Sequence, residues 1–165
     1  MLNKLTLLLF TILQIILTEN TMKQIDVNGM TIKWETKSDE VVFEVFAPTD
    51  GWIAIGFNST NNIVGTNLIM GALRNNKSIV EDQYVVSMGV HKQIELIGGK
   101  TAINNFLCSE DKKGTTMKFR ISKKQLDKFH YPLKERTKIW LICAYSEEDD
   151  FNHHSIMREH VEVII

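Results

Sequence analysis

The sequence contains few cysteines and prolines, the residues that restrict a chain covalently, and it has almost no net charge. Among its 165 residues there are two cysteines and two prolines, and the formal net charge is −1. A near-neutral balance gives no basic surface of the kind that binds nucleic acid or anionic membranes. The spacing of Cys108 and Cys143 leaves both a disulfide and two buried free thiols open. Residues 23–165 contain no repeat, low-complexity tract or linker, so we expect a single domain.

Common catalytic and cofactor-binding motifs are also missing. The chain has no CxxCH motif for covalent haem attachment, no HExxH zinc motif, no phosphate-binding loop or GxGxxG fingerprint, and no GxSxG nucleophile motif. Since no catalytic constellation is found, we do not expect the protein to be an enzyme.

No apolar run is long enough to span a bilayer comfortably, which takes about 20 residues. The longest candidate is at the N-terminus, where Lys4 precedes a segment from Leu5 to Leu17 that is apolar apart from two threonines and one glutamine. A secretory signal has this arrangement, with an apolar region of roughly 7–15 residues. We therefore expect residues 1–20 to be a cleaved signal peptide and residues 21–165 to form a secreted or periplasmic domain. The alternative is an N-terminal helix or anchor that is retained.

Short segments of alternating apolar and polar residues occupy most of the remaining chain. This period of two is typical of half-buried strands, and strands at 8–12-residue spacing indicate an antiparallel sandwich or barrel. We expect strands over residues 30–35, 41–47, 51–57, 68–73, 78–86, 93–97, 116–121, 137–145 and 159–165, and one helical turn over 122–129. The aromatic and apolar residues expected in the core include Trp34, Phe43, Trp52, Ile55, Phe119 and Trp140.

The stretch GWIAIGFNSTNNIVGTNLIMG, from Gly51 to Gly71, organises the rest of the prediction. Its bulky apolar start predicts a strand, the polar residues 58–62 predict a loop, and residues 68–73 predict a second strand. We therefore expect an inner strand pair of a β-sandwich, with the connecting loop at one open end.

A second unusual segment is DDFNHHSIMREH, residues 149–160, which contains three of the five histidines. It lies between the apolar strand at 137–145 and the last strand, where a sandwich presents a loop. Neutral imidazole is a ligand for transition metals and haem iron. Zinc bound by His154 and His160 has little support, because no thiolate is near. Asp149 and Asp150 form either a carboxylate pair or a solvated loop.

GWIAIGF, read together with DDFNHHSIMR and the alternating strands between them, resembles the DOMON family, including the cytochrome domain of cellobiose dehydrogenase. The resemblance covers nearly the whole mature chain. It implies an immunoglobulin-like antiparallel β-sandwich whose cytochrome members hold one haem b non-covalently, with a methionine and a histidine as axial ligands.

Carried onto this sequence, the resemblance implies His154 as the histidine ligand, with His153 as the fallback. In several branches the methionine stands two residues before a glycine, but here Ile63 occupies that position. The methionine near this loop is Met70, which is either the thioether ligand or a core residue. Trp52, Ile55, Phe57 and Leu68 are expected to bury the macrocycle. Arg158 is either a partner for a haem propionate or part of a surface ion pair.

The expected function is therefore one-electron transfer by an exported haem b domain. Its implied partner is a redox protein, either a membrane cytochrome or an exported oxidoreductase. One alternative is a DOMON-type module without iron that binds a sugar or another small ligand. A structural or adhesion domain is the third reading.

Overall fold

The computed structural model describes residues 22–165, so the predicted signal peptide at residues 1–20 lies outside the described part of the chain. The described residues form β-strands and one short 3-10 helix, which confirms the all-β prediction. The elements are β1 (Lys23–Val27), β2 (Met30–Thr36), β3 (Glu40–Ala47), β4 (Ile53–Asn58), β5 (Asn67–Arg74), β6 (Lys77–Ser87), β7 (Val90–Gln93), η1 (Ile94–Ile97), β8 (Ile103–Asp111), β9 (Gly114–Ser122), β10 (Lys138–Tyr145) and β11 (Met157–Ile164).

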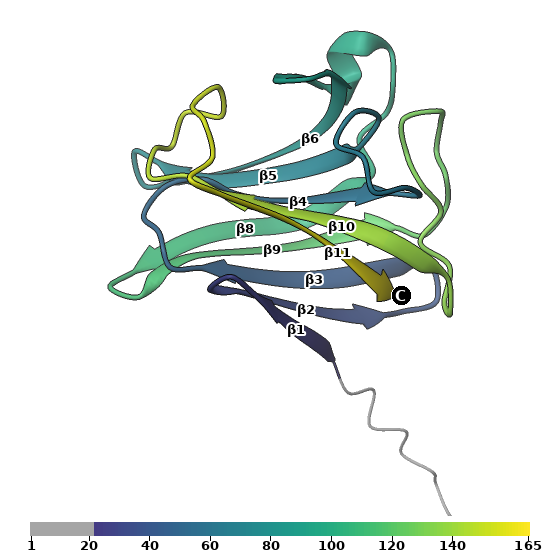
Figure 1. The fold of residues 1–165 in the computed structure, drawn as a ribbon, viewed down its shortest axis with the longest axis horizontal. Coiled ribbons are helices and arrows are strands. Elements are labelled where there is room, and N and C mark those ends of the chain that lie inside the picture. The colour runs from purple at the N-terminus through teal and green to yellow at the C-terminus, as the bar shows by residue number, and fades with distance from the viewer. Residues whose placement is uncertain (1–21) are drawn as a thin grey trace, which may run out of the picture.

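Two antiparallel sheets form the sandwich (Figure 1). One has five strands in the order β1-β2-β3-β9-β8, and the other has six in the order β11-β10-β4-β5-β6-β7. The predicted inner pair is confirmed, because β4 and β5 are neighbours at the centre of the six-stranded sheet. Within residues 22–165, no helix has the length and apolar character needed to cross a bilayer.

Strand alternation builds the main core between the two sheets. On β4, Ile53, Ile55 and Phe57 point inward and are at most 1% exposed. Phe43 of β3 lies opposite them, with its ring centroid 5.2 Å from Phe57 and 5.3 Å from Phe119. Gly71 of β5 also faces this core, where a Cβ would lie 2.5 Å from the Met117 sulfur, so glycine is needed for the sheets to approach there.

Three expectations about local structure were wrong. Residues 122–129 form no helix, because their backbone pairs elsewhere: Lys123 donates to the Asp39 carbonyl and accepts from the Leu133 amide. Residues 94–97 form a 3-10 turn rather than a strand. Trp140 lies on the outer face of β10 and is only partly buried, because its neighbours Ile139 and Leu141 take the inward positions.

The sequence analysis missed the first strand and the eighth. β1 is short and mostly exposed, and β8 exposes most of its side chains and contains an irregularity between Asn104 and Leu107. Both are edge strands. An edge strand buries little apolar surface, so it carries a weak alternation pattern.

A buried polar network fixes β6 to the loop before β10. The His130 ring lies 2.7 Å from an Asp127 oxygen through Nδ1 and 3.2 Å from an Asp82 oxygen through Nε2. Asp82 also accepts from the Asn67 side chain at 2.6 Å and from the Ala102 amide at 2.7 Å. His130 and Asp82 are almost fully buried, and the partners of the Asp82 carboxylate satisfy both of its oxygens.

Candidate functional site

A cleft lies on the outer face of the six-stranded sheet, away from the main core. Its floor contains a row of side chains that cross-strand pairing places side by side: Met70 of β5 opposite Ala54 of β4, Ala54 opposite Ala144 of β10, and Ala144 opposite Arg158 of β11. At the usual strand spacing this row extends about 14 Å from Met70 to Arg158. The cleft is open to solvent, and its empty space is about 700 Å³ when the solvent in its mouth is included.

The floor is hollow because the central strand carries small residues on its outer face. The outward positions of β4 include Ala54 and Gly56, and Gly56 pairs with Leu68 on one side and Ile142 on the other. A Cβ on Gly56 would lie 2.4 Å from a Thr66 methyl carbon, so this position cannot take a larger residue without movement. The larger side chains on β5 and β10 therefore flank a recess over β4.

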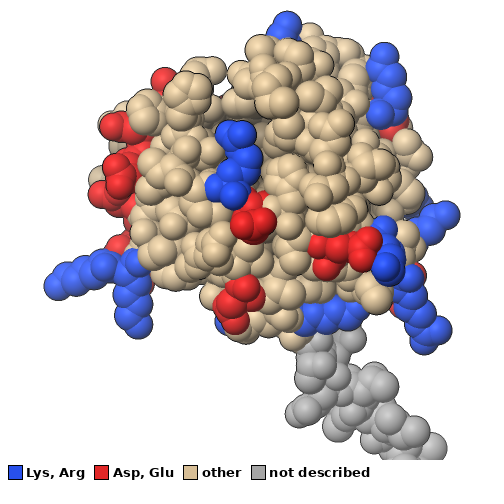
Figure 2. Space-filling model, viewed as in Figure 1, with Lys and Arg blue, Asp and Glu red and all other residues tan. Residues whose placement is uncertain are grey.

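Two segments rise above the outer face and form the walls of the cleft (Figure 1). The β6–β7 hairpin contributes Val85, Met88, Val90 and His91. The loop between β10 and β11 contributes residues 152–155. In Figure 2 a hollow opens in the upper middle of a mostly uncharged area, and acidic and basic side chains lie around its margins.

The loop between β10 and β11 is anchored from below by Ser146. The Ser146 amide donates to the Trp52 carbonyl at 3.0 Å, and its hydroxyl donates to the His154 carbonyl at 3.0 Å. The Asp150 carbonyl accepts from the His153 amide at 2.9 Å. Ser146 is fully buried, so these contacts fix the backbone of the two histidines against the sheet.

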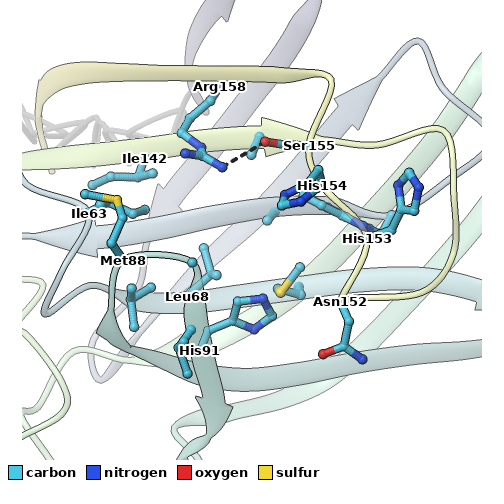
Figure 3. Close-up of a pocket in the computed structure, with 17 residues that line it drawn as sticks. Ile63, Leu68, Met88, His91, Ile142, Asn152, His153, His154, Ser155 and Arg158 are labelled. Atoms are coloured by element: carbon cyan, nitrogen blue, oxygen red, sulfur yellow. Dashed lines mark hydrogen bonds between the residues drawn. The ribbon is translucent and has the colours of Figure 1, made fainter.

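Met70, His154 and His153 all line this cleft, so the structure brings together the three residues that the sequence nominated as ligands. Met70 is 1% exposed and lies in the floor, within an outer apolar cluster that includes Trp52 and Leu68. Figure 3 shows the His154 ring directed toward the middle of the cleft, whereas the His153 ring points away from it. The His153 Nδ1 atom lies 3.4 Å from the Ser146 hydroxyl.

The predicted pocket residues divide between the two faces of the sheet. Trp52, Leu68 and Arg158 line the cleft. Ile55 and Phe57 do not, because they point to the opposite face of β4 and belong to the core between the sheets. Grouping them with Trp52 and Leu68 was therefore a mistake about which side of β4 faces the cleft.

His91 is the cleft residue that the sequence analysis missed. It lies on β7 and pairs with Val85 of β6. A short strand with an isolated histidine carries no recognisable motif, and only the folding of the β6–β7 hairpin brings His91 beside the other donors. Burial lowers its pKa, and this outweighs the opposing influence of the Glu81 charge and of a hydrogen bond with the Phe151 backbone. The ring is therefore neutral at pH 7.

The other residues that the sequence analysis considered as metal ligands or as a carboxylate pair make hydrogen bonds that stabilise the structure around them. His160 contacts the Asn61 side chain at 2.6 Å, and within residues 22–165 no cluster of three or more histidine, cysteine or acidic residues suited to a metal ion is found. Asp150 is exposed and accepts from the Asn152 amide at 3.0 Å, while the Asp149 carbonyl accepts from Arg74 at 2.7 Å. These two residues therefore shape the loop.

Both cysteines are buried free thiols, so the open question about a disulfide is settled in favour of thiols. Cys108 and Cys143 belong to the core between the sheets. Burial raises the pKa of each thiol to about 12, with nearby acidic residues adding to the shift. The two side chains are therefore protonated at neutral pH.

The fold and sequence match known proteins. The cytochrome b domain of pyranose dehydrogenase from Coprinopsis cinerea superposes with a TM-score of 0.66 at 8% identity, covering 87% of this chain and 81% of that one. The cytochrome domain of Myriococcum thermophilum cellobiose dehydrogenase superposes with a TM-score of 0.61 at 10% identity, with the same coverage. The model of the DOMON domain matches residues 26–146, which include Met70 and end before the two adjacent histidines. Since this match spans well over half of the sequence, the chain belongs to the DOMON domain family.

Proposed function

We propose that this protein is an electron-transfer domain that binds one haem b in the cleft, with Met70 and His154 as axial ligands. The observation that carries the proposal is the donor set. A thioether in the floor and an imidazole on the wall line one apolar recess, although 84 residues separate them in the sequence. Imidazole and thioether are established axial ligands of haem iron.

Other residues of the cleft fit the same group. Leu68, Ile142 and Val85 provide an apolar surface for a macrocycle. Arg158 donates to the Ser155 hydroxyl at 3.1 Å, and its guanidinium is otherwise placed to pair with a carboxylate at the edge of the cleft. Trp52 has a buried indole N–H with no acceptor among the described residues, and a bound group can supply one. The ligand-type donors carry more weight than this N–H, because Trp34 has the same property away from the cleft.

Haem held by these residues would supply reversible one-electron chemistry at iron. A thioether ligand raises the reduction potential relative to a second imidazole, because soft sulfur favours the reduced iron. When both axial positions are filled by protein, no position remains for a substrate. We therefore infer that the domain is not itself an enzyme, and that it exchanges electrons with an exported or membrane-bound redox partner. The fold neighbours, which are cytochrome domains of two dehydrogenases, support this assignment.

Reconstitution with haem tests the proposal. The mature domain is mixed with haem and its visible spectrum is recorded, and a Soret band with a low-spin spectrum is expected. His154→Ala should abolish or shift this band while the far-ultraviolet circular dichroism of the strands stays the same. His153→Ala is the matched control and should change little, because its ring points away from the cleft.

Met70→Leu tests the thioether separately. This change conserves side-chain volume, so a lost low-spin spectrum would report the missing sulfur rather than altered packing. A wild-type protein that bound no haem would overturn the proposal. The cleft would then be a site for a sugar or another small ligand, which a glycan array would examine.

A further inference from the structure

We propose that Asn76 is the site at which this protein carries an N-linked oligosaccharide, and that Asn58, which has the same sequence signal, carries none. The acceptor signal is an asparagine followed two residues later by serine or threonine. The sequence contains it twice, as Asn58-Ser59-Thr60 and as Asn76-Lys77-Ser78. Neither asparagine lines the cleft, so the modification is independent of the proposed haem site.

Asn58 is buried, and both ends of its side-chain amide are used. It is the last residue of β4 and is 2% exposed. Its nitrogen donates to the Asn62 carbonyl at 2.7 Å and to the Thr66 hydroxyl at 3.2 Å, and its oxygen accepts from the Thr60 amide at 3.1 Å. A sugar would replace a hydrogen of this nitrogen, and a group of that size has no room in a buried position. A chain modified at Asn58 therefore cannot reach this fold.

Asn76 is exposed, in the two-residue turn between β5 and β6. β5 ends at Arg74 and β6 begins at Lys77, so Asn75 and Asn76 are the turn residues. Their φ angles are 51° and 59°, as the turn that joins two twisted hairpin strands requires. Within the described residues 22–165, the Asn76 side chain makes no hydrogen bond. Its amide nitrogen is therefore accessible to an enzyme and has room for a sugar.

Ser78, the third residue of the signal, has a contact in the fold that forms later than the hairpin. Its hydroxyl accepts from the Cys108 amide at 2.6 Å, and Cys108 lies 30 residues further along the chain. The predicted signal peptide would bring the chain into the secretory pathway from its N-terminus, so the β5–β6 hairpin enters before β8. The Ser78 hydroxyl is therefore still free for recognition when the sugar is transferred.

The transfer needs a co-substrate that the secretory membrane supplies, a lipid pyrophosphate that carries an oligosaccharide. The bond between C1 of the sugar and the pyrophosphate oxygen breaks, and a bond between C1 and Nδ2 of Asn76 forms. The amide gives up one proton and the lipid pyrophosphate leaves, so neither an oxidant nor a reductant is required.

The glycan would extend from the end of the sandwich where the loop between β10 and β11 lies. Arg74, next to the turn, donates to the Asp149 carbonyl of that loop at 2.7 Å (Figure 1). The β6–β7 hairpin, which forms one wall of the cleft, is at the other end of β6. The mouth of the cleft is therefore left open for a bound group.

The test is expression of the full chain in a eukaryotic cell line that secretes N-glycosylated proteins. Protein from the medium should carry one glycan, and peptide N-glycosidase should remove it and convert Asn76 into aspartate, which peptide mass spectrometry locates. Asn76→Gly should abolish the glycan and keep the fold, because Asn-Gly is a preferred pair for this turn. Asn75→Gly is the matched control, because it changes the neighbouring turn residue and leaves the signal intact.

The signal at Asn58 is tested in the same cells. Thr60→Ala removes this signal and should leave the glycan mass of the secreted protein unchanged. Asn58→Ala should also leave the glycan mass unchanged, but it should lower the secreted yield, because it removes the hydrogen bonds of a buried amide.

Secreted protein with an unmodified Asn76, or with a glycan on Asn58, would overturn the assignment. A full chain that stays in the cytoplasm would overturn it as well, since such a chain never meets the transferase. After reconstitution with haem, Asn76→Gly and wild type should give the same Soret band, because the turn lies outside the cleft. The glycan and the haem site can therefore each fail without the other.

Discussion

At the scale of single residues, the most informative group outside the cleft is His130. Burial by itself lowers the pKa of this histidine, but the hydrogen bond and charge of Asp82, followed by those of Asp127, reverse the effect and raise it. Burial by itself raises the pKa of Asp127, but hydrogen bonds from the Phe129 and Lys100 amides, followed by the contact with His130, lower it. The protonated imidazole is therefore a structural cation between two carboxylates.

This cation predicts that the protein loses stability as the pH rises. A group whose pKa is raised in the folded state contributes stability that is fully present below its unfolded pKa of about 6.5. That contribution is lost as the pH rises through the folded pKa. We expect the urea concentration at the unfolding midpoint to decrease as the pH is raised from about 6 to above the folded pKa of His130. The His130→Asn variant should be less stable, and its midpoint should depend less on pH. An unchanged slope in the variant would show that His130 is not the titrating group.

The buried thiols give a second prediction at this scale. Cys108 and Cys143 are 1% and 0% exposed, and the thiolate is the reactive form of cysteine. Because burial raises the pKa of both to about 12, neither should react with a thiol-modifying reagent at pH 8 in the folded protein. Both should react after denaturation, and mass spectrometry would count the adducts. Modification of the folded protein would show that the core between the sheets opens readily.

At the scale of strands, the aromatic cluster between the sheets dominates the packing. Phe119 of β9 is 1% exposed and stacks on Phe43, with an interplanar angle of 15°. Phe119→Ala should therefore destabilise the domain by about 3–5 kcal/mol, since it leaves a cavity in a close-packed core. Phe106→Ala on the neighbouring β8 is the control, because that side chain is 46% exposed and should matter much less. Equal losses in chemical denaturation would contradict the packing described above.

The same strands show what sequence alone can predict. The alternation around Phe43 and Phe119 gives the correct inward face, because these strands have one face in the core and one in solvent. Alternation fails on β4, where both faces are buried, so it could not tell which of Trp52 and Ile55 faces the cleft. It fails for Ser122 to Phe129 because long-range backbone pairing overrides the local helical pattern.

The candidate site was predictable only where a motif marked it. The adjacent histidines and the glycine-flanked strand pair drew attention to His154 and Met70. His91 could not be found in this way, because its place in the cleft depends on the strand order β5-β6-β7. These strands follow one another in the chain, but the register of the β6–β7 hairpin, with its irregularity between Val85 and Ser87, decides which face His91 takes, and no local pattern encodes that register.

At the scale of the whole molecule, the sequence before the described residues predicts export. Exported protein should lack residues 1–20, because a signal peptide is cleaved on the way out. Intact-mass measurement on protein collected outside the cytoplasm would check this. A mass that includes Met1 to Thr18 would contradict cleavage and favour the retained anchor.

The two faces of β4 serve different purposes, and this lets engineering treat them separately. Folding depends on the inward residues such as Ile53 and Phe57, while the recess depends on the small outward residue Ala54. The recess can therefore be filled from its floor. Ala54→Leu would place a larger side chain next to Met70 and leave the core between the sheets unchanged. Such a variant would be a folded control for the domain, with the same surface and partner contacts but without room for a bound group in the cleft.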